Sequence, residues 1–323
     1  MNIGIIDSGV IKNYINDNVD IVEYVNFYDK SNMTSLVQEE NLHGTLVLNT
    51  IEKYSTKQNR YYICNITGKN QKGSCKAVFK SLQYLSSKKE LQVIIMSFCV
   101  KSQSREIQEV LHKLKKQGVI LFASQENMGI GGFPATDYSV IGVGREKYAF
   151  DCSYTFCKNA PIQIGANANP EFIRMGKQHY ELFMGTSKAV PLFATIVMNH
   201  VNEHQWNSQE IFKYIKNNKR THALLRKQYY IKEKQRRKKE EKYQCIWNYI
   251  NLYRKSTNTL EVSLEQQRSD LPTLSIISQL SDVWKMIEYV AKRAEVVVDY
   301  EQIMFKDFCT VGALAEYIEK QQI

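Results

Sequence analysis

No apolar run in this 323-residue chain reaches the roughly 18 uncharged residues that a membrane-spanning helix needs. The opening residues MNIGIIDSGV have no basic start, no long apolar core and no small-residue cleavage site. We therefore interpret them as a first strand and not as a signal peptide. The 7 cysteines include no Cys-x-x-Cys pair, which argues against a disulfide framework and against a zinc site. Such cysteine usage fits the reducing cytosol, so we expect a cytoplasmic protein that needs no cofactor and no metal.

Outside residues 213–242, positive and negative side chains are equal in number. The net charge is +10, and residues 213–242 hold 13 Lys or Arg against 3 Asp or Glu, so this stretch accounts for the whole excess. One interpretation is a solvated helix or linker. The other is a site for an acidic partner, a membrane surface or nucleic acid, although no nucleic-acid fold signature accompanies the stretch.

Predicted strands alternate with predicted helices along the first two thirds of the chain. We expect strands at 2–7, 61–68, 91–100, 119–124 and 139–146, and helices at 43–54, 76–87 and 105–118. This alternation predicts an α/β fold with a mostly parallel sheet and helices on both faces.

Polar side chains stand at the ends of these elements. Asp7 ends a strand and Asn127 follows one, whereas His43 and Ser187 each begin an apolar helix. A serine hydroxyl becomes a nucleophile when a histidine takes its proton, and a carboxylate orients that histidine. The oxyanion that forms needs hydrogen-bond donors, which the Asn127 amide and the N–H groups of a helix N-terminus can supply. We expect Pro191 to be tolerated because N–H groups in the first helical turn have no partners.

The motifs around these residues resemble those of subtilisin-like serine peptidases (subtilases), in the family's order Asp, His, Ser. IIDSGV resembles the aspartate motif, HGT the histidine motif and GTSKAVP the serine motif. The resemblance covers residues 1–220. It implies a subtilisin-like fold and a catalytic triad of Asp7, His43 and Ser187.

Two further segments resemble the substrate-binding parts of that family. ASQENMG resembles the oxyanion segment, which implies that Asn127 lies in the oxyanion hole, and FPATDYSVIGVG (133–144) resembles the segment that follows it. MSF resembles the segment that pairs with the substrate backbone as an added strand. The resemblance therefore implies substrate binding by Ser97, Phe98 and Cys99.

The chain departs from the family pattern at several motif positions. Leu46 follows HGT, and Lys188 stands where Met is usual. Glu126 replaces the usual Gly beside the oxyanion Asn, and Cys99 replaces a Gly of the substrate groove. The groove is therefore expected to be narrowed or shaped for unusual peptides. No propeptide precedes the first strand, which favours an intracellular enzyme.

The C-terminal residues 269–323 predict a helix, a short strand-like piece and a final helix. They resemble the second half of an acyl or peptidyl carrier domain. Aligning Leu280 with the Leu of the carrier motif places Gln279 where the modified Ser would stand. We consider a degenerate carrier-like docking domain and an unspecific helical appendage. The expected domains are a peptidase at 1–220, a basic helical or linker segment at 221–268 and this small helical domain.

Two functions follow from these expectations. One is an intracellular serine endopeptidase with restricted specificity, such as leader-peptide removal from a modified peptide precursor. The other is a catalytically weak or inactive scaffold that binds a peptide and docks a biosynthetic enzyme through its C-terminal domain. The expected partners are a peptide or protein substrate, that biosynthetic enzyme, and an acidic partner for residues 213–242.

Overall fold

The computed structural model falls into two compact units. It describes residues 1–28, 41–68, 73–100, 102–127, 131–149, 151–177, 179–204, 208–221, 243–263, 267, 271–277 and 282–322. The first unit comprises residues 1–168, 175–179 and 184–221, and the second comprises 169–174, 180–183 and 222–323.

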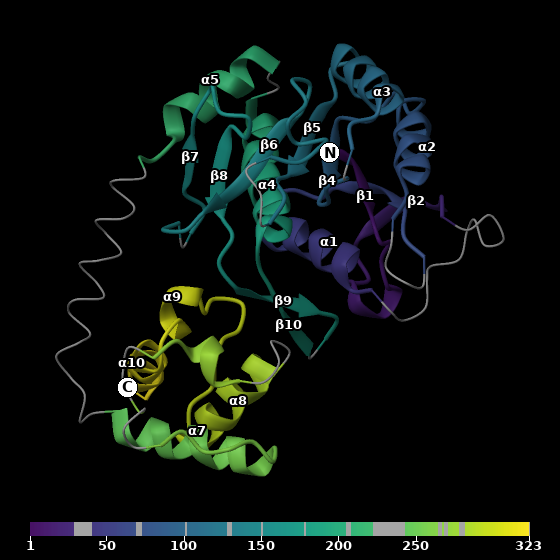
Figure 1. Ribbon diagram of the computed structural model, residues 1–323. Helices are drawn as coiled ribbons and strands as arrows, with labels where there is room; N and C mark the ends of the chain where they lie inside the picture. Colours follow the sequence, from purple (N-terminus) through teal and green to yellow (C-terminus); the bar gives the residue numbers. More distant parts are fainter. Residues whose placement is uncertain are drawn as a thin grey trace. The chain divides into compact units, whose positions relative to one another are not determined.

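The first unit contains an eight-stranded sheet, counted over the described residues (Figure 1). Its strand order is β2-β3-β1-β4-β5-β6-β8-β7, and every pairing is parallel except the one between β7 and β8. The strands are β1 (Asn2–Asp7), β2 (Asp20–Asn26), β3 (Arg60–Asn65), β4 (Val93–Met96), β5 (Ile120–Ser124), β6 (Ile141–Glu146), β7 (Tyr154–Phe156) and β8 (Ile164–Asn167). The predicted α/β fold with a mostly parallel sheet is thereby confirmed.

Helices cover both faces of this sheet because both faces of its central strands are apolar. On one face, Ile94 and Met96 of β4 belong to a core cluster with residues of α2 and α3. On the other face, Phe122 of β5 meets Phe193 of α4, with ring centroids 6.1 Å apart. The helices of this unit are α1 (His43–Tyr54), α2 (Cys75–Leu85), α3 (Arg105–Lys116), α4 (Thr186–His204) and α5 (Ser208–Asn218).

Local sequence signals set the ends of α2 and α3. The side chains of Ser74 and Ser104 accept hydrogen bonds from the N–H groups of Ala77 and Ile107, as N-cap residues do. Gly118 follows α3 with a φ of 86°, the left-handed conformation that ends many helices. The predicted helices 76–87 and 105–118 are confirmed to within two residues.

The two edge strands of the sheet, β2 and β7, were not predicted from the sequence. β2 is only half-buried along its whole length, and its pairing with β3 shifts between Ile21 and Glu23. That irregularity removes the alternation of apolar and polar residues by which an edge strand is recognised in a sequence. β7 has 3 residues, too few to show a period.

The second unit has its own apolar core. Trp247 of α7, Met286 of α8 and Leu314 of α10 are all buried in it, and Phe172 packs against Phe308 at 5.1 Å between ring centroids. Its elements are β9 (Glu171–Met175) and β10 (His179–Phe183), whose bounds extend beyond the unit, with α7 (Gln244–Ser256), a 3-10 turn (Thr273–Ile276), α8 (Val283–Arg293), α9 (Phe305–Phe308) and α10 (Val311–Gln321).

Helix α7 lies in the segment 221–268, which was expected to be helical or a linker, and it contributes to the same core as α8. One feature of this unit differs from the sequence-based prediction. The strand-like piece around Val297 is not a strand, and the Val297 side chain is 89% exposed. The carrier-motif positions 278–281 and most of the basic stretch, 222–242, lie outside the described residues. The proposed domain boundaries stay a prediction.

Candidate active site

Three neighbouring strands end at the same edge of the sheet. Ile6 of β1 is in register with Met96 of β4, so Asp7, the last residue of β1, lies beside Ser97, the first residue after β4. Met96 is in turn in register with Ala123 of β5, and the segment leading to Asn127 starts just beyond. Parallel pairing thus brings together residues that are far apart in the sequence.

Asp7 and His43 form a direct hydrogen bond. The Nδ1 atom of His43 lies 2.8 Å from Oδ1 of Asp7, and the same oxygen accepts the N–H of Ser8 at 2.7 Å. The Asp7 side chain is buried, whereas 33% of the His43 side chain is exposed. In the neutral ring this arrangement places the proton on Nδ1 and the lone pair on Nε2. His43 can therefore accept a proton on its Nε2 side.

The surroundings of His43 act on its pKa in opposite directions. Burial lowers the pKa, because it disfavours the charged ring, while the negative charge of Asp7 and the hydrogen bond to it raise the pKa. The balance is a raised pKa. Asp7 thus stabilises the imidazolium that forms when His43 takes up a proton.

Helix α1 approaches the end of β1 so closely that its second residue must be a glycine. A Cβ atom on Gly44 would lie 2.1 Å from the carbonyl oxygen of Gly9. The N–H of Gly44 donates to Oγ of Ser8 at 3.0 Å, and the N–H of His43 donates to Oδ1 of Asn41 at 3.0 Å. These contacts hold the start of α1, and with it His43, against Ser8 and Gly9, the residues that follow Asp7.

Ser187 is the second residue of α4, half-buried at its N-terminus. The residue four positions later is Pro191, which has no N–H to donate to the Ser187 carbonyl. The hydroxyl of Ser97 donates to that carbonyl oxygen instead, at 2.9 Å. The expectation that Pro191 lies in the first turn is therefore wrong, and Ser97 compensates for the lost bond.

Asn127 is held by the residue that precedes Ser187. Its Oδ1 atom accepts the N–H of Thr186 at 3.1 Å and the Thr186 hydroxyl at 2.9 Å. Because both bonds engage Oδ1, the amide nitrogen Nδ2 is available as a donor. Gly185 adds to this contact: its φ is 80°, and a Cβ there would lie 3.0 Å from Oδ1 of Asn127.

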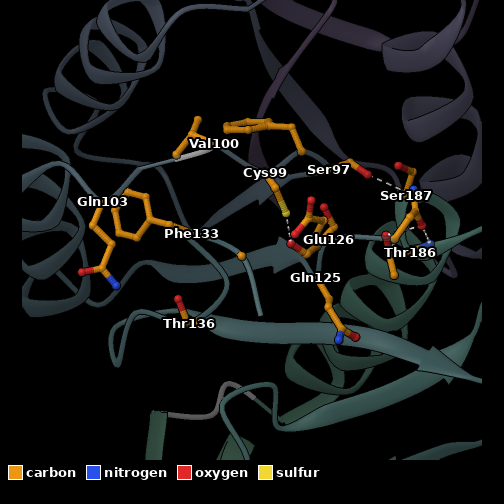
Figure 2. Close-up of a pocket in the computed structure, with 14 residues that line it drawn as sticks. Ser97, Cys99, Val100, Gln103, Gln125, Glu126, Phe133, Thr136, Thr186 and Ser187 are labelled. Carbon is orange, nitrogen blue, oxygen red and sulfur yellow. Dashed lines mark hydrogen bonds between the residues drawn. The ribbon is translucent and has the colours of Figure 1, made fainter. Parts of the chain in front are cut away.

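A pocket of about 880 Å³ adjoins Ser187 (Figure 2). It contains the three residues expected to bind substrate, although the Ser97 hydroxyl is directed to Ser187. The lining consists of residues 97–100, 124–127, 132–133 and 186–187 together with Gln103 and Thr136. The pocket therefore places Asn127 and Ser187 beside the segment that is expected to bind substrate.

Cys99 lines this pocket. Its thiol donates to the carbonyl oxygen of Ser124 at 2.9 Å, and burial raises the pKa of the thiol to about 11. A Cβ on Gly132 would lie only 2.8 Å from its Sγ atom. Cys99 is therefore a neutral thiol packed close to Gly132. That the groove is narrowed stays a prediction.

The overall architecture matches solved structures of proteases. Sphericase aligns with a TM-score of 0.56 at 14% identity, over 65% of this chain and 80% of that chain. The chain has a subtilisin-like fold. The S41 psychrophilic protease aligns with a TM-score of 0.55 at 16% identity, over 65% and 80% of the two chains. A lanthipeptide protease aligns with a TM-score of 0.52 at 15% identity, over 65% and 77%.

Sequence comparison agrees with this fold. The chain is 23% identical over 205 residues to the minor extracellular protease Epr of Bacillus subtilis (strain 168). The match takes in 59% of this chain and 30% of the length of Epr. No family model matches the chain.

Several site residues carried no interpretable signal in the sequence. Thr186 lies inside the GTS motif, but its bond to Asn127 depends on two segments that meet only in the fold. Gln103 and Gly132 line the pocket outside every motif recognised in the sequence, and Thr136 lies within FPATDYSVIGVG, where nothing singled it out. Among the described residues, no group of three or more His, Cys, Asp or Glu is arranged to hold a metal ion. No helix in the described parts of the chain is long and apolar enough to cross a membrane.

Proposed function

We propose that this chain is a serine endopeptidase that hydrolyses peptide bonds through an acyl-enzyme. The observation that carries the proposal is the 2.8 Å hydrogen bond between Asp7 and His43, at the sheet edge where Ser97 holds the backbone of Ser187. A carboxylate, an imidazole and a helix-terminal serine are the parts that nucleophilic acyl transfer requires.

Each residue has a defined role in the proposed reaction. Nε2 of His43 takes the proton of Ser187 as the serine Oγ attacks the scissile carbonyl carbon. Asp7 orients the ring and stabilises the imidazolium. Nδ2 of Asn127 and the N–H of Ser187 donate to the oxyanion. His43 then gives its proton to the leaving amine, and water, activated by the same histidine, releases the acyl group.

Active-site labelling tests this proposal. A fluorophosphonate probe should modify wild-type protein covalently, Ser187→Ala should abolish labelling, and His43→Ala should strongly reduce it. Ser86→Ala, a serine substitution at the end of α2, serves as the matched control and should label like the wild type. A well-folded wild type that stays unlabelled would instead favour the peptide-binding scaffold.

Restricted specificity is the finer part of the proposal. Cys99 and Glu126 both line the pocket beside Ser187, and each occupies a position where the subtilase pattern has Gly. We propose the removal of a leader peptide from a modified precursor, in a cytoplasmic setting, supported by the fold likeness to a lanthipeptide protease. Incubation with casein and with a panel of precursor peptides tests it, because a restricted enzyme should cut one precursor site while leaving casein largely intact. Rapid degradation of casein would contradict the restriction.

A further inference from the structure

The pocket beside Ser187 contains a carboxylate that the proposed reaction does not use. Glu126 lies between the end of β5 and Asn127, and its side chain is exposed to solvent within the pocket lining. Of the lining residues in the described part of the chain, Glu126 is the one that carries a formal charge at neutral pH. In Figure 2 it stands between Cys99 and Ser187.

The walls of the pocket converge on the base of this side chain. A Cβ atom on Gly132 would lie 2.8 Å from Sγ of Cys99, 3.2 Å from the backbone nitrogen of Glu126 and 3.5 Å from its Cβ. Burial is the main cause of the raised pKa of Cys99, and the negative charge of Glu126 adds to it. The carboxylate therefore acts on the interior of the pocket and not only on the solvent around it.

We propose that this pocket binds the side chain of a Lys or Arg residue that precedes the scissile bond, with Glu126 as its counter-charge. This inference rests on the proposed peptidase function. The aliphatic part of such a side chain can lie against Phe98, Val100 and Phe133 of the lining, while its cationic end reaches Glu126. Gln103 and Thr136 also line the pocket, and their side-chain oxygen atoms are of a kind that accepts N–H groups.

Other side chains fit this lining less well. An acidic residue would meet the like charge of Glu126. A large apolar residue would displace water from the carboxylate without replacing its hydrogen bonds, which is costly for a charged group. A cationic side chain gains a charge-assisted hydrogen bond where the others lose one.

Fluorogenic peptides that differ only in the residue before the scissile bond test the inference. We compare Arg, Lys, norleucine, Phe and Glu, where norleucine reproduces the linear chain of Lys without its charge. The wild type should prefer Arg or Lys over norleucine by at least about tenfold in kcat/KM, and Glu126→Gln should reduce that preference by about tenfold. Glu109→Gln, which removes the same charge from an exposed pair with Arg105 on α3, should keep it.

The salt dependence of the substrate preference provides a second test. Salt weakens an exposed ion pair by screening its charges, but it does not change how well a side chain fits the pocket by shape. Raising the ionic strength from about 0.01 M to about 1 M shortens the screening length from about 30 Å to about 3 Å. The preference for Arg over norleucine should fall in the wild type and change little in Glu126→Gln. A preference for Phe or norleucine, or an Arg preference that survives Glu126→Gln, overturns the inference.

The two proposals can fail separately. Labelling of Ser187 together with cleavage after neutral residues overturns the cation pocket and leaves the peptidase standing. If the wild type neither labels nor cleaves, the peptidase proposal falls. The affinity of product peptides for the Ser187→Ala protein then still tests the cation pocket. Peptides ending in Arg should bind at least about tenfold more tightly than those ending in norleucine. Equal affinities overturn the cation pocket.

Discussion

The hydroxyl of Ser97 donates to the Ser187 carbonyl oxygen, which Pro191 in the second turn of α4 leaves without its helical partner. The hydroxyl of Ser97 lies 2.9 Å from the Ser187 carbonyl oxygen, which a helix without proline would satisfy through the N–H of residue 191. Ser97 is itself only 3% exposed. The end of β4 thereby holds the start of α4, and the position of the proposed nucleophile depends on a residue 90 positions earlier.

This relationship predicts the effect of Ser97→Ala. The substitution leaves the Ser187 carbonyl oxygen without its donor, so we expect a loss of about 1 kcal/mol in the free energy of unfolding and a lower kcat. In a Pro191→Ala background the helix regains an N–H for that oxygen, so Ser97→Ala should cost clearly less there. Urea denaturation of the four proteins measures the coupling. Equal losses in both backgrounds would show that the two residues act independently.

The hold of Thr186 on Asn127 predicts a second effect. Thr186→Val removes one of the two hydrogen bonds to Oδ1, so we expect kcat to fall by about tenfold with little change in KM, since the misplaced amide acts in the transition state. Asn127→Ala removes the donor entirely and should lower kcat by about 10²–10³. Thr186→Ser keeps the hydroxyl and serves as the control. Steady-state kinetics on one peptide decides, and a fully active Thr186→Val would refute the role of Thr186.

The raised pKa of His43 predicts the acid limb of the pH–rate profile. The proposed base works only as the neutral ring, so kcat/KM should fall as the pH drops through a value above the ordinary pKa of about 6.5. Asp7→Asn removes the influence that raises the pKa and leaves burial, which lowers it. The limb should then move to lower pH, and kcat should drop by about 10⁴ because the tautomer is lost. An acid limb that stays in place in Asp7→Asn contradicts the assignment.

The contribution of His43 to the free energy of unfolding should change with pH in the opposite sense to kcat/KM: it falls as the pH rises. A folded-state pKa above the unfolded value means that His43 stabilises the fold fully below the unfolded pKa, and that this contribution disappears as the pH rises through the folded pKa. The protonated state that stabilises the protein is thus the inactive one. Comparing unfolding free energies of wild type and His43→Ala from acid to neutral pH measures this difference.

The close approach of Cys99 and Gly132 predicts a packing defect. Gly132→Ala puts a Cβ 2.8 Å from Sγ of Cys99 and forces alanine into a φ of 123°, so we expect about 1–3 kcal/mol of destabilisation. Adding Cys99→Ala to the Gly132→Ala variant should recover only the part of the lost stability that comes from the steric clash, because the strained φ at residue 132 remains. The matched control is Gly131→Ala, whose Cβ would meet one atom at 3.4 Å, and we expect a much smaller change. Thermal unfolding of these variants measures the effect, and similar losses at both glycines would contradict it.

The central sheet and its helices were predictable because their signals are local. The apolar run before Asp7, the serine caps at Ser74 and Ser104 and the glycine at 118 act over a few residues, and each element begins or ends where they stand. The bulged edge strand β2 was missed for the same reason: its place depends on pairing with β3 and not on its own pattern.

The candidate site divides in a similar way. Asp7, His43, Asn127 and Ser187 were expected together because each lies in a short motif and parallel strands end at one edge. That edge brings Asp7 into contact with His43 and places Asn127 and Ser187 along one pocket. The direct approach of His43 to Ser187 stays a prediction.

By itself, the sequence determined which residue types stand at the ends of strands and helices, since those depend on neighbours along the chain. Only the tertiary structure decided that Ser97 bonds to Ser187, that Thr186 orients Asn127, and that Cys99 and Glu126 line one pocket. These contacts join segments of different strands and helices. Their geometry is set by how the elements pack, which no local pattern of residues encodes.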